Sequence, residues 1–284
     1  SADALILAEQ SWDSWWFWDS EDSDEATNIH MFDISDSGTT EYIASGRVDG
    51  TIQNQFSLSE YQGILRVAST EGQWGRWWLN NPEPMTSNVV TLQPITDATG
   101  HTTLEQIGLI EGIAPNETIW SARFVEDRAY IVTFENMDPL WTIDLSDPTN
   151  PTIMGELKIP GVSTYIHPIS DNTLLTIGMG PADLETGEGL DWSNVRLSLF
   201  DVSDFTNPIE TTTLTISPVE DENNPCWSWS SSEATYEHKA FQYWAPKSML
   251  AVPMNTYTSG YYDYEARTYV ECQREWVSKL MITN

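Results

Sequence analysis

Short β-strand patterns recur along the whole chain and restrict it to few possible folds. Four segments carry an apolar run and then a polar turn that ends in aspartate: IHMFDISDSG, VVTLQPITDATG, LWTIDLSDPTNP and RLSLFDVSDFTNP. The turn aspartates, Asp36, Asp97, Asp147 and Asp204, are 61, 50 and 57 residues apart, and a further β-branched run follows each turn. Segments that give two short strands around a polar turn lie between them. One period therefore predicts four antiparallel strands.

Four antiparallel strands per period are typical of a β-propeller blade. We predict an all-β propeller of four-stranded antiparallel blades, with about four and a half blades in a single partial domain. The predicted blades cover residues 1–48, 49–112, 113–161, 162–217 and 218–284. The first lacks its innermost strand and the last lacks its outermost strand. Open blades expose sheet edges, so we expect a ring of seven or eight blades. The missing strands would come from the remaining N-terminal part of the same propeller or from another protein subunit.

The turn aspartates have a local structural explanation. Asp and Ser side chains accept hydrogen bonds from backbone amides two residues further on, and a following proline fixes φ. We therefore predict that Asp36, Asp97, Asp147 and Asp204 shape hairpins and do not bind a metal. The segment DISDSG comes near a calcium-loop pattern, but Ala44 stands where that pattern needs glutamate.

Aromatic and acidic residues gather in the loops between the second and third strands of successive blades. These loops emerge on one face of a propeller, where we predict a surface that binds sugars, peptides or an aromatic partner. The alternative is that the loops pack on one another as a cap, or that a partner subunit covers them. The candidate binding residues are Trp12, Trp15, Trp16, Phe17, Trp18, Trp74, Trp77 and Trp78. A looser Ca²⁺ site, with no other cofactor expected, would use Asp19, Glu21, Asp22 and Asp24.

Charge and cysteine content limit the partners and the compartment. The formal net charge of −31 argues against nucleic acid and anionic membranes, and it suits a salt-loving or marine source. The chain has no apolar run long enough to span a membrane. Cys226 and Cys272 are the two cysteines, and in a secreted or cell-surface protein we expect them to form a disulfide. Two buried free thiols are the alternative.

The sequence also resembles a known family. The segments NQFSLSEYQGILRVAST, DPLWTIDLSDPTNPTIMGELKIPG, LSLFDVSDFTNP and EHKAF resemble secreted bacterial and archaeal proteins with a C-terminal β-propeller distantly related to WD repeats. The resemblance covers nearly the whole chain and implies the propeller fold. Members of that family are usually longer, with more blades before the point that matches Ser1. The family has no general activity, so the resemblance implies no catalytic residues.

Catalytic motifs for metalloproteases, serine hydrolases and phosphate binding are missing from the sequence. The first residues of the innermost strands should line the central channel, and they are Gln55, Arg123, His167, His238 and Lys239. Our leading hypothesis is a non-catalytic extracellular binding or scaffold module. The alternatives are a hydrolase or lyase that uses the channel face, with His238 and carboxylates, and a structural subunit of a cell-surface assembly.

Overall fold

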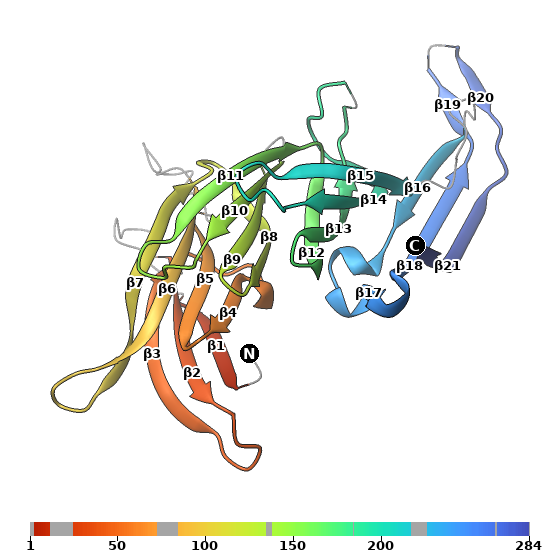
Figure 1. The fold of residues 1–284 in the computed structure, drawn as a ribbon. Helices are drawn as coiled ribbons and strands as arrows, with labels where there is room; N and C mark the ends of the chain where they lie inside the picture. The colour runs from red at the N-terminus through yellow and green to blue at the C-terminus, as the bar shows by residue number, and fades with distance from the viewer. Residues whose placement is uncertain are drawn as a thin grey trace. The chain divides into compact units, whose positions relative to one another are not determined.

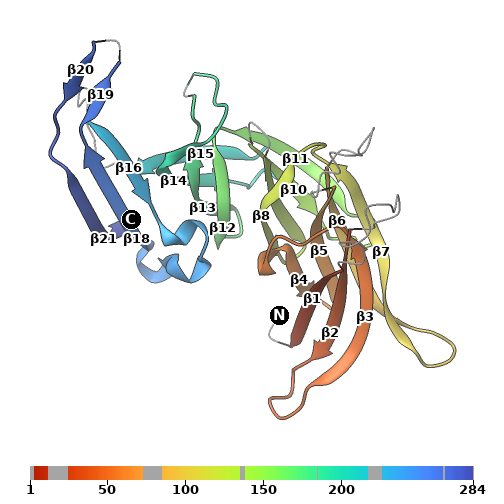
Figure 2. The same ribbon diagram turned by 180° about the vertical axis from the view of Figure 1, so that it is seen from behind.

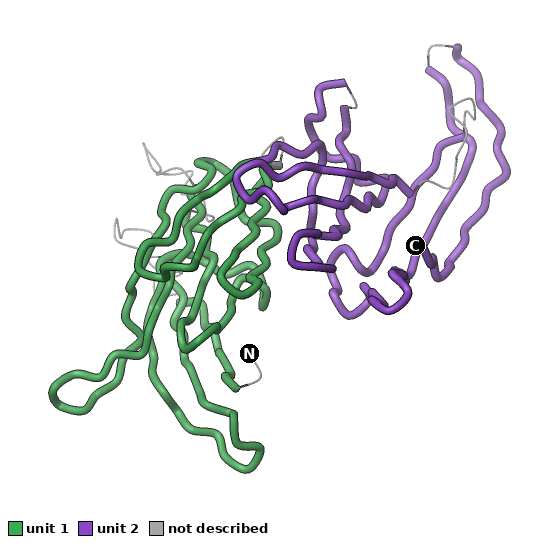
Figure 3. Tube along the Cα trace, viewed as in Figure 1, with its two compact units in different colours: residues 1–135, 139–156 green, residues 136–138, 157–284 purple. Residues whose placement is uncertain are grey.

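A computed structural model describes residues 3–11, 25–72, 85–134, 138–183, 185–216, 226–264 and 266–283. Within these ranges the chain forms twenty-one β-strands and four short 3₁₀ turns (Figure 1). The chain divides into two compact units, which we describe separately. The first comprises residues 1–135 and 139–156, and the second comprises residues 136–138 and 157–284 (Figure 3). No helix in the described ranges is both long and apolar enough to cross a membrane.

The first unit contains two sheets of antiparallel meanders. The larger sheet has the order β1-β2-β3-β7-β6-β5-β4, and the smaller has the order β11-β10-β9-β8. The strands of the larger sheet are β1 (Ala4–Ser11), β2 (Ala26–Asp33), β3 (Glu41–Asp49), β4 (Leu58–Tyr61), β5 (Ile64–Glu71), β6 (Thr86–Thr96) and β7 (Thr102–Ile113). Those of the smaller are β8 (Thr118–Val125), β9 (Arg128–Phe134), β10 (Asp138–Asp144) and β11 (Thr152–Ile159). A 3₁₀ turn, η1 (Gln55–Ser57), precedes β4.

The larger sheet is two blades joined at their outermost strands. β3 and β7 run parallel and pair at one position, Ser45 with Thr103. The strands approach closely there because the neighbouring residue on β3 is Gly46. A Cβ atom at Gly46 would lie 2.6 Å from the carbonyl oxygen of Leu104, nearer than side-chain carbons approach. The sequence predicted the two meanders but not their union into one sheet.

The second unit contains one four-stranded meander and a last sheet with an irregular strand order. β12 (Val162–Ser170), β13 (Thr173–Gly180), β14 (Asp191–Asp201) and β15 (Ile209–Ile216) form a four-stranded sheet. In the last sheet, β18 (Met249–Ser259) pairs with β16 (Trp227–Ser231) and β17 (Gln242–Trp244) on one side and with β21 (Glu275–Thr283) on the other (Figure 1). Figure 2 shows β16, β18 and β21 from behind. β16 and β17 together form an interrupted first strand. Between them lie η2 (Glu233–Thr235) and η3 (His238–Ala240), and η4 (Ala245–Lys247) follows β17.

Central strands of the complete sheets are buried on both faces. Residues 65–70 of β5, 129–133 of β9 and 174–180 of β13 are buried without a break. Strands that carry continuous burial have a neighbour on each face, whereas one-sided strands alternate. The all-β architecture of four-stranded antiparallel sheets in propeller-like blades agrees with the sequence prediction.

The repeated turns work as the sequence predicted. The carboxylate of Asp147 accepts hydrogen bonds from the Thr149 amide at 2.9 Å and from the Thr149 hydroxyl at 2.7 Å. The same pair of bonds forms from Thr99 to Asp97 and from Thr206 to Asp204, and Asp36 accepts from the Gly38 amide. The prediction that these aspartates shape hairpins is confirmed.

Two arginines hold strands to neighbouring backbone. Arg66 of β5 is buried between the rings of Tyr61 and Phe124, with its guanidinium carbon 5.2 and 5.4 Å from their centroids. It donates to the carbonyl of Glu126 and, at 2.6 Å, to the hydroxyl of Ser59. Burial lowers the pKa of Arg66 to about 10, which leaves it charged at neutral pH. It therefore ties the β4–β5 hairpin to the β8–β9 turn.

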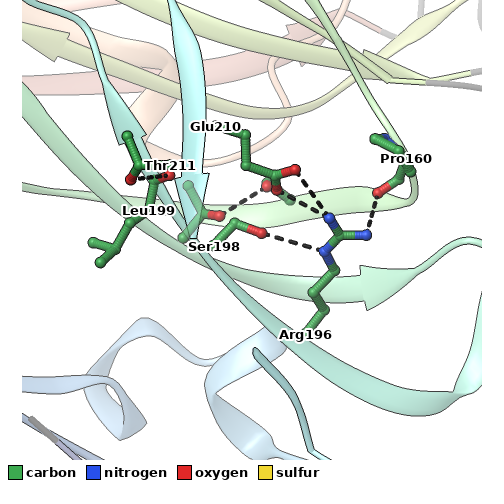
Figure 4. Close-up of polar contacts among 8 residues, drawn as sticks. Pro160, Arg196, Ser198, Leu199, Glu210 and Thr211 are labelled. Atoms are coloured by element: carbon green, nitrogen blue, oxygen red, sulfur yellow. Dashed lines mark hydrogen bonds and ion pairs between the residues drawn. The ribbon is translucent and has the colours of Figure 1, made fainter. Parts of the chain in front are cut away.

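Arg196 does the same in the second unit (Figure 4). From β14 it donates to both carboxylate oxygens of Glu210 on β15 at 3.0 Å, and to the carbonyl oxygen of Pro160 at 2.9 Å. Its Nε lies 3.3 Å from the Ser198 hydroxyl. Both bonds to Glu210 come from Nη2, while Nη1 binds Pro160, so one guanidinium links β14, β15 and the connection before β12.

The Arg66 contacts predict a large effect of a single substitution. Arg66→Leu should lower the free energy of unfolding by about 2–3 kcal/mol, because it removes a buried charged donor that binds the Glu126 carbonyl and the Ser59 hydroxyl and lies between two rings. Urea denaturation measures this. Exposed Lys158→Ala is the control and should change stability by about 0.5 kcal/mol or less. Equal effects of the two variants would contradict the role of Arg66.

The aspartate turns predict a pH dependence with a definite sign. The threonine hydroxyls and the turn amides hold the pKa of Asp97, Asp147 and Asp204 below the ordinary value of 3.8. The stability that these carboxylates add is present above the ordinary pKa and is lost as pH falls through the folded value. Replacing all three by Asn keeps an acceptor but removes the titration.

The wild type should therefore lose more stability than this triple variant between about pH 6 and pH 3, as measured by urea midpoints. Relief of the net negative charge acts on both proteins and largely cancels in the difference. An identical loss in the two proteins would show that the turn carboxylates do not couple to folding.

Candidate functional site: an aromatic hairpin and its surroundings

Most of the predicted loop site cannot be placed. The aromatic candidates Trp12, Trp15, Trp16, Phe17, Trp18, Trp74, Trp77 and Trp78 lie outside the described residues. So do the candidate Ca²⁺ ligands Asp19, Glu21, Asp22 and Asp24. Their roles stay predictions. The corresponding connection of the last sheet, between β18 and β21, is described and gives the geometry of one such loop.

This connection is a hairpin held by a disulfide. β19 (Tyr261–Asp263) pairs with β20 (Thr268–Val270) beyond the end of β18 (Figure 1). Cys272, just after β20, is bonded to Cys226, which immediately precedes β16. The predicted disulfide is confirmed. It fixes the exit of the hairpin to the start of the interrupted first strand.

The base and tip of the hairpin have clear local causes. Gly260 sits at the base, where a Cβ atom would lie 2.3 Å from the carbonyl oxygen of Val270. At the tip, the Asp263 carboxylate accepts a hydrogen bond of 2.9 Å from the amide of Ala266. Only glycine allows the strands to leave β18 so close together, and the aspartate closes the turn.

Tyrosines cover the hairpin. Tyr261, Tyr262, Tyr264 and Tyr269 are all exposed, and Tyr264 keeps 84% of its surface accessible. The rings of Tyr262 and Tyr264 meet edge to face, with centroids 5.1 Å apart and planes at 73°. Exposed tyrosines on a rigid hairpin offer large contact area at little cost in side-chain entropy.

The hairpin region is nearly neutral, unlike the chain as a whole. Residues 261–283 contain the basic residues Arg267, Arg274 and Lys279 alongside four acidic residues. The whole chain has 12 basic and 43 acidic residues, so bases are concentrated here. The expected combination of aromatics with dense acid does not hold for this loop. Contacts there would depend on apolar area and hydrogen bonds more than on charge.

Two of the predicted channel residues lie in the first unit. Gln55 is exposed on η1. The guanidinium carbon of Arg123, on β8, lies 4.7 Å from the ring centroid of Phe56, the residue next to Gln55. The structure therefore places Arg123 against Phe56, the residue that follows Gln55 in the chain.

The other three lie in the second unit. His167 on β12 packs against the rings of Tyr165, Phe241 and Tyr243, at centroid distances of 6.2, 5.3 and 5.5 Å. Its Nδ1 atom is 3.4 Å from the Tyr165 hydroxyl. His238 and Lys239 belong to η3, which is followed by Phe241. The aromatic surroundings of His167 were not predicted, although the alternation in AFQYW could have indicated them.

These residues do not form a metal centre of the usual kind. Among the residues that the structure describes, no three His, Cys, Asp or Glu side chains are placed to hold a metal ion together. His238 instead has Nδ1 3.5 Å from its neighbour Glu237. Glu237 also accepts from the Lys239 amide at 3.0 Å, which makes it the cap of η3.

The sequence profile described as the beta propeller domain matches residues 1–277. The chain belongs to this family. The family assignment agrees with the four-stranded sheets and says nothing of a ligand.

Two archaeal relatives are similar in sequence. An uncharacterized protein of Methanocaldococcus jannaschii is 42% identical over 168 residues, which is 59% of this chain and 23% of that protein. An uncharacterized protein of Archaeoglobus fulgidus is 39% identical over 186 residues, which is 66% of this chain and 25% of that protein. The matched region thus spans about a quarter of these curated relatives.

Solved structures show weaker likeness. A protein from Lactobacillus plantarum aligns with a TM-score of 0.32 at 7% identity, covering 96% of this chain and 82% of its own. The Nup133 beta-propeller domain of Vanderwaltozyma polyspora aligns with a TM-score of 0.30 at 9% identity, covering 99% of this chain and 92% of its own.

The disulfide should contribute strongly to the stability of the last sheet. Its removal by the double variant Cys226→Ser and Cys272→Ser should lower the free energy of unfolding by up to about 4 kcal/mol, on the chain-entropy account of a loop this long. Urea denaturation of the wild type with and without reductant measures the same quantity. Reductant should leave the double variant unchanged. A wild type indifferent to reductant would contradict the prediction.

Proposed function

We propose that this chain is part of a non-catalytic, extracellular β-propeller module that binds or scaffolds another protein through its aromatic loop face. The observation that carries the proposal is the β19–β20 hairpin, on which Tyr261, Tyr262, Tyr264 and Tyr269 are exposed together. Its exit is fixed to the start of β16 by the Cys226–Cys272 disulfide. A rigid, tyrosine-covered projection of this kind resembles the contact surfaces of binding proteins.

The ring geometry favours a protein over a sugar. A run of sugars stacks on ring faces that point the same way, whereas Tyr262 and Tyr264 are at 73° to each other. The near neutrality of residues 261–283 also means that the hairpin itself carries no dense charge to bind a small cationic ligand. Protein surfaces suit such an arrangement, because tyrosine combines apolar area with a hydroxyl for hydrogen bonding.

The extracellular location is supported by the disulfide and by the family resemblance stated above. Disulfides persist in oxidising compartments and are rare in cytosolic proteins. The same proposal includes a relation to WD repeats, a single partial domain with the predicted blade boundaries, and a ring of seven or eight blades. A salt-rich habitat would account for the net charge of −31.

Site-specific photo-crosslinking tests the proposed function. A benzophenone amino acid replaces Tyr264 in the protein expressed in its source organism. The control carries it at Tyr236, which is 80% exposed and lies apart from the hairpin in sequence. We expect a discrete cross-linked protein from position 264 and none from position 236.

Failure to cross-link at position 264, or the same products from both positions, would contradict a partner at the hairpin. The readouts for the other hypotheses are different. Saturable binding of a defined oligosaccharide that Tyr264→Ala abolishes would favour a sugar site. Turnover of a substrate that is lost in His238→Ala would favour the enzyme hypothesis. A cross-link to a stoichiometric cell-surface component would identify the structural subunit.

A further inference from the structure

A short motif between β7 and β8 is not used by the proposed function. Residues 116–118 read Asn-Glu-Thr, which is the acceptor pattern for N-linked glycosylation, Asn-x-Ser/Thr with x other than proline. This pattern occurs once in the 284 residues. Patterns of three residues also arise by chance, so the meaning of this one depends on what the structure places around it.

The connection that carries the motif is buried at its two ends and exposed between them. Ile113 at the end of β7, the following Ala114, and Ile119 of β8 are buried in one hydrophobic cluster. Pro115 and Asn116, which lie between them in the chain, are exposed. Packing therefore fixes the base of the connection, while Asn116 lies at the surface.

Hydrogen bonds fix the backbone of Asn116. Its amide donates to the carbonyl oxygen of Met85 at 2.7 Å, and the Glu117 amide donates to the carbonyl oxygen of Ala114 at 3.0 Å. Asn116 has a φ of 72°. This is the left-handed region, which asparagine adopts more readily than most residues other than glycine. The turn alone thus explains why asparagine suits position 116.

The side chain of Asn116 has no comparable structural role. Within the part of the chain that the structure describes, its carboxamide makes no hydrogen bond. The side chain of the next residue differs, because the Glu117 carboxylate accepts a hydrogen bond from the hydroxyl of Thr133 on β9. Both N–H groups of the Asn116 carboxamide are therefore available. An acceptor nitrogen has to be accessible and uncommitted, and this nitrogen is both.

Thr118 supplies a hydroxyl that the motif requires and the fold does not use. Thr118 begins β8, where its backbone lies opposite Phe134 of β9. Over the described ranges its hydroxyl makes no hydrogen bond. Valine has the same branched shape and also suits a strand. The strand explains a β-branched residue here, but not the hydroxyl.

The surroundings of Asn116 leave room for a bulky group on one side. At Gly112, near the end of β7, an added Cβ atom would meet no atom within 4 Å. On the other side, Met85 binds the Asn116 amide and the Ser87 hydroxyl lies 3.5 Å from the Glu117 carbonyl oxygen. A group attached to Asn116 would therefore lie beside the point where the chain enters β6.

We propose that Asn116 carries an N-linked glycan on its side-chain nitrogen. The donor is a saccharide whose C1 atom is linked to a lipid phosphate. The Asn116 nitrogen forms a bond to C1 and loses one proton, and the bond from C1 to the phosphate oxygen breaks, with its electron pair leaving on the lipid phosphate. No oxidant or reductant is needed. A carboxamide nitrogen is a weak nucleophile because its lone pair is delocalised, so a transferase of the cell catalyses the step.

This inference rests on the proposed extracellular location, because N-linked transfer takes place outside the cytoplasm. The Cys226–Cys272 disulfide supports the same compartment. It does not rest on a partner at the tyrosine hairpin. A glycan is bulky and solubilising, so at Asn116 it would keep other proteins away from the β7–β8 connection. Binding of a partner would then be confined to other parts of the surface.

Mass spectrometry of the protein from its source organism tests the proposal. The peptide that contains Asn116 should be heavier than its sequence by whole sugar residues, and fragmentation should place the addition on Asn116. Asn150 is the internal control, because it is exposed and lies two residues before Thr152, but Pro151 stands between them. Its peptide should have the mass of its sequence. An unmodified Asn116, or the same addition on Asn150, would overturn the proposal.

A matched pair of variants at position 118 gives an independent test in the source organism. Thr118→Ser keeps the acceptor pattern and should keep the added mass. Thr118→Val removes only the hydroxyl and should lose the added mass completely. Added mass that persists in Thr118→Val, or that disappears from both variants, would overturn the proposal.

Two further measurements separate loss of the glycan from loss of the fold. Wild type and Thr118→Val, both produced in a host without N-linked glycosylation, should have the same urea midpoint. Asn116→Gly removes the acceptor and suits the left-handed backbone, so it should also lose the added mass in the source organism. Retention of the addition in Asn116→Gly would place it on another residue and overturn the proposal.

Protease treatment of intact cells separates this proposal from the proposed location. Protein that is digested from outside, with Asn116 unmodified, would contradict the glycan alone. Protein that is protected inside the cell, with Asn116 unmodified, would contradict both the glycan and the extracellular location. Thr118→Val should leave cross-linking from position 264 unchanged, since the glycan and the hairpin are independent.

Discussion

Face-to-face packing of four-stranded sheets is the interaction on which the rest of this structure depends. The central strands β5, β9 and β13 carry apolar residues on both faces, so each sheet needs a neighbour on either side. At about 25 cal/mol for each Å² of apolar surface removed from water, such contacts dominate the stability of the blades. Polar interactions add specific links between neighbouring segments. Arg66 and Arg196 illustrate this, since each binds the backbone carbonyl of an adjacent turn or strand connection.

The part of the fold that could be predicted depends on local sequence patterns. Strand alternation and Asp-turn chemistry are properties of a few neighbouring residues, so the meanders and the roles of Asp97, Asp147 and Asp204 followed from the sequence. The disulfide followed because the chain has two cysteines. The split first strand of the last sheet did not follow. β16 and β17 are short and separated in sequence, and they act as one strand only because both pair with β18.

Long-range partners limited what the sequence could say of the sites. Arg66 lies in an apolar run where alternation suggests an outward residue, and its acceptor on Glu126 is 60 residues away. The aromatic surroundings of His167 could not be predicted for the same reason, because Phe241 and Tyr243 are distant in sequence. The tyrosine hairpin was expected as part of an aromatic loop face, but its near neutrality was hidden by the charge of the whole chain. Local composition, read over residues 261–283, was the signal that could have revealed it.

The single parallel pair between β3 and β7 has a consequence for cooperativity. Two meanders that would otherwise be separate sheets share one hydrogen-bonded network at Ser45 and Thr103, where Gly46 lets the strands meet. In an array of independent repeats, each repeat can open without its neighbours. Here, local unfolding of either meander removes the hydrogen-bonding partner of β3 or β7 in the other. The two meanders should therefore unfold together as one cooperative segment. Gly46, which has no side chain, thereby determines whether the first unit contains one unfolding segment or two.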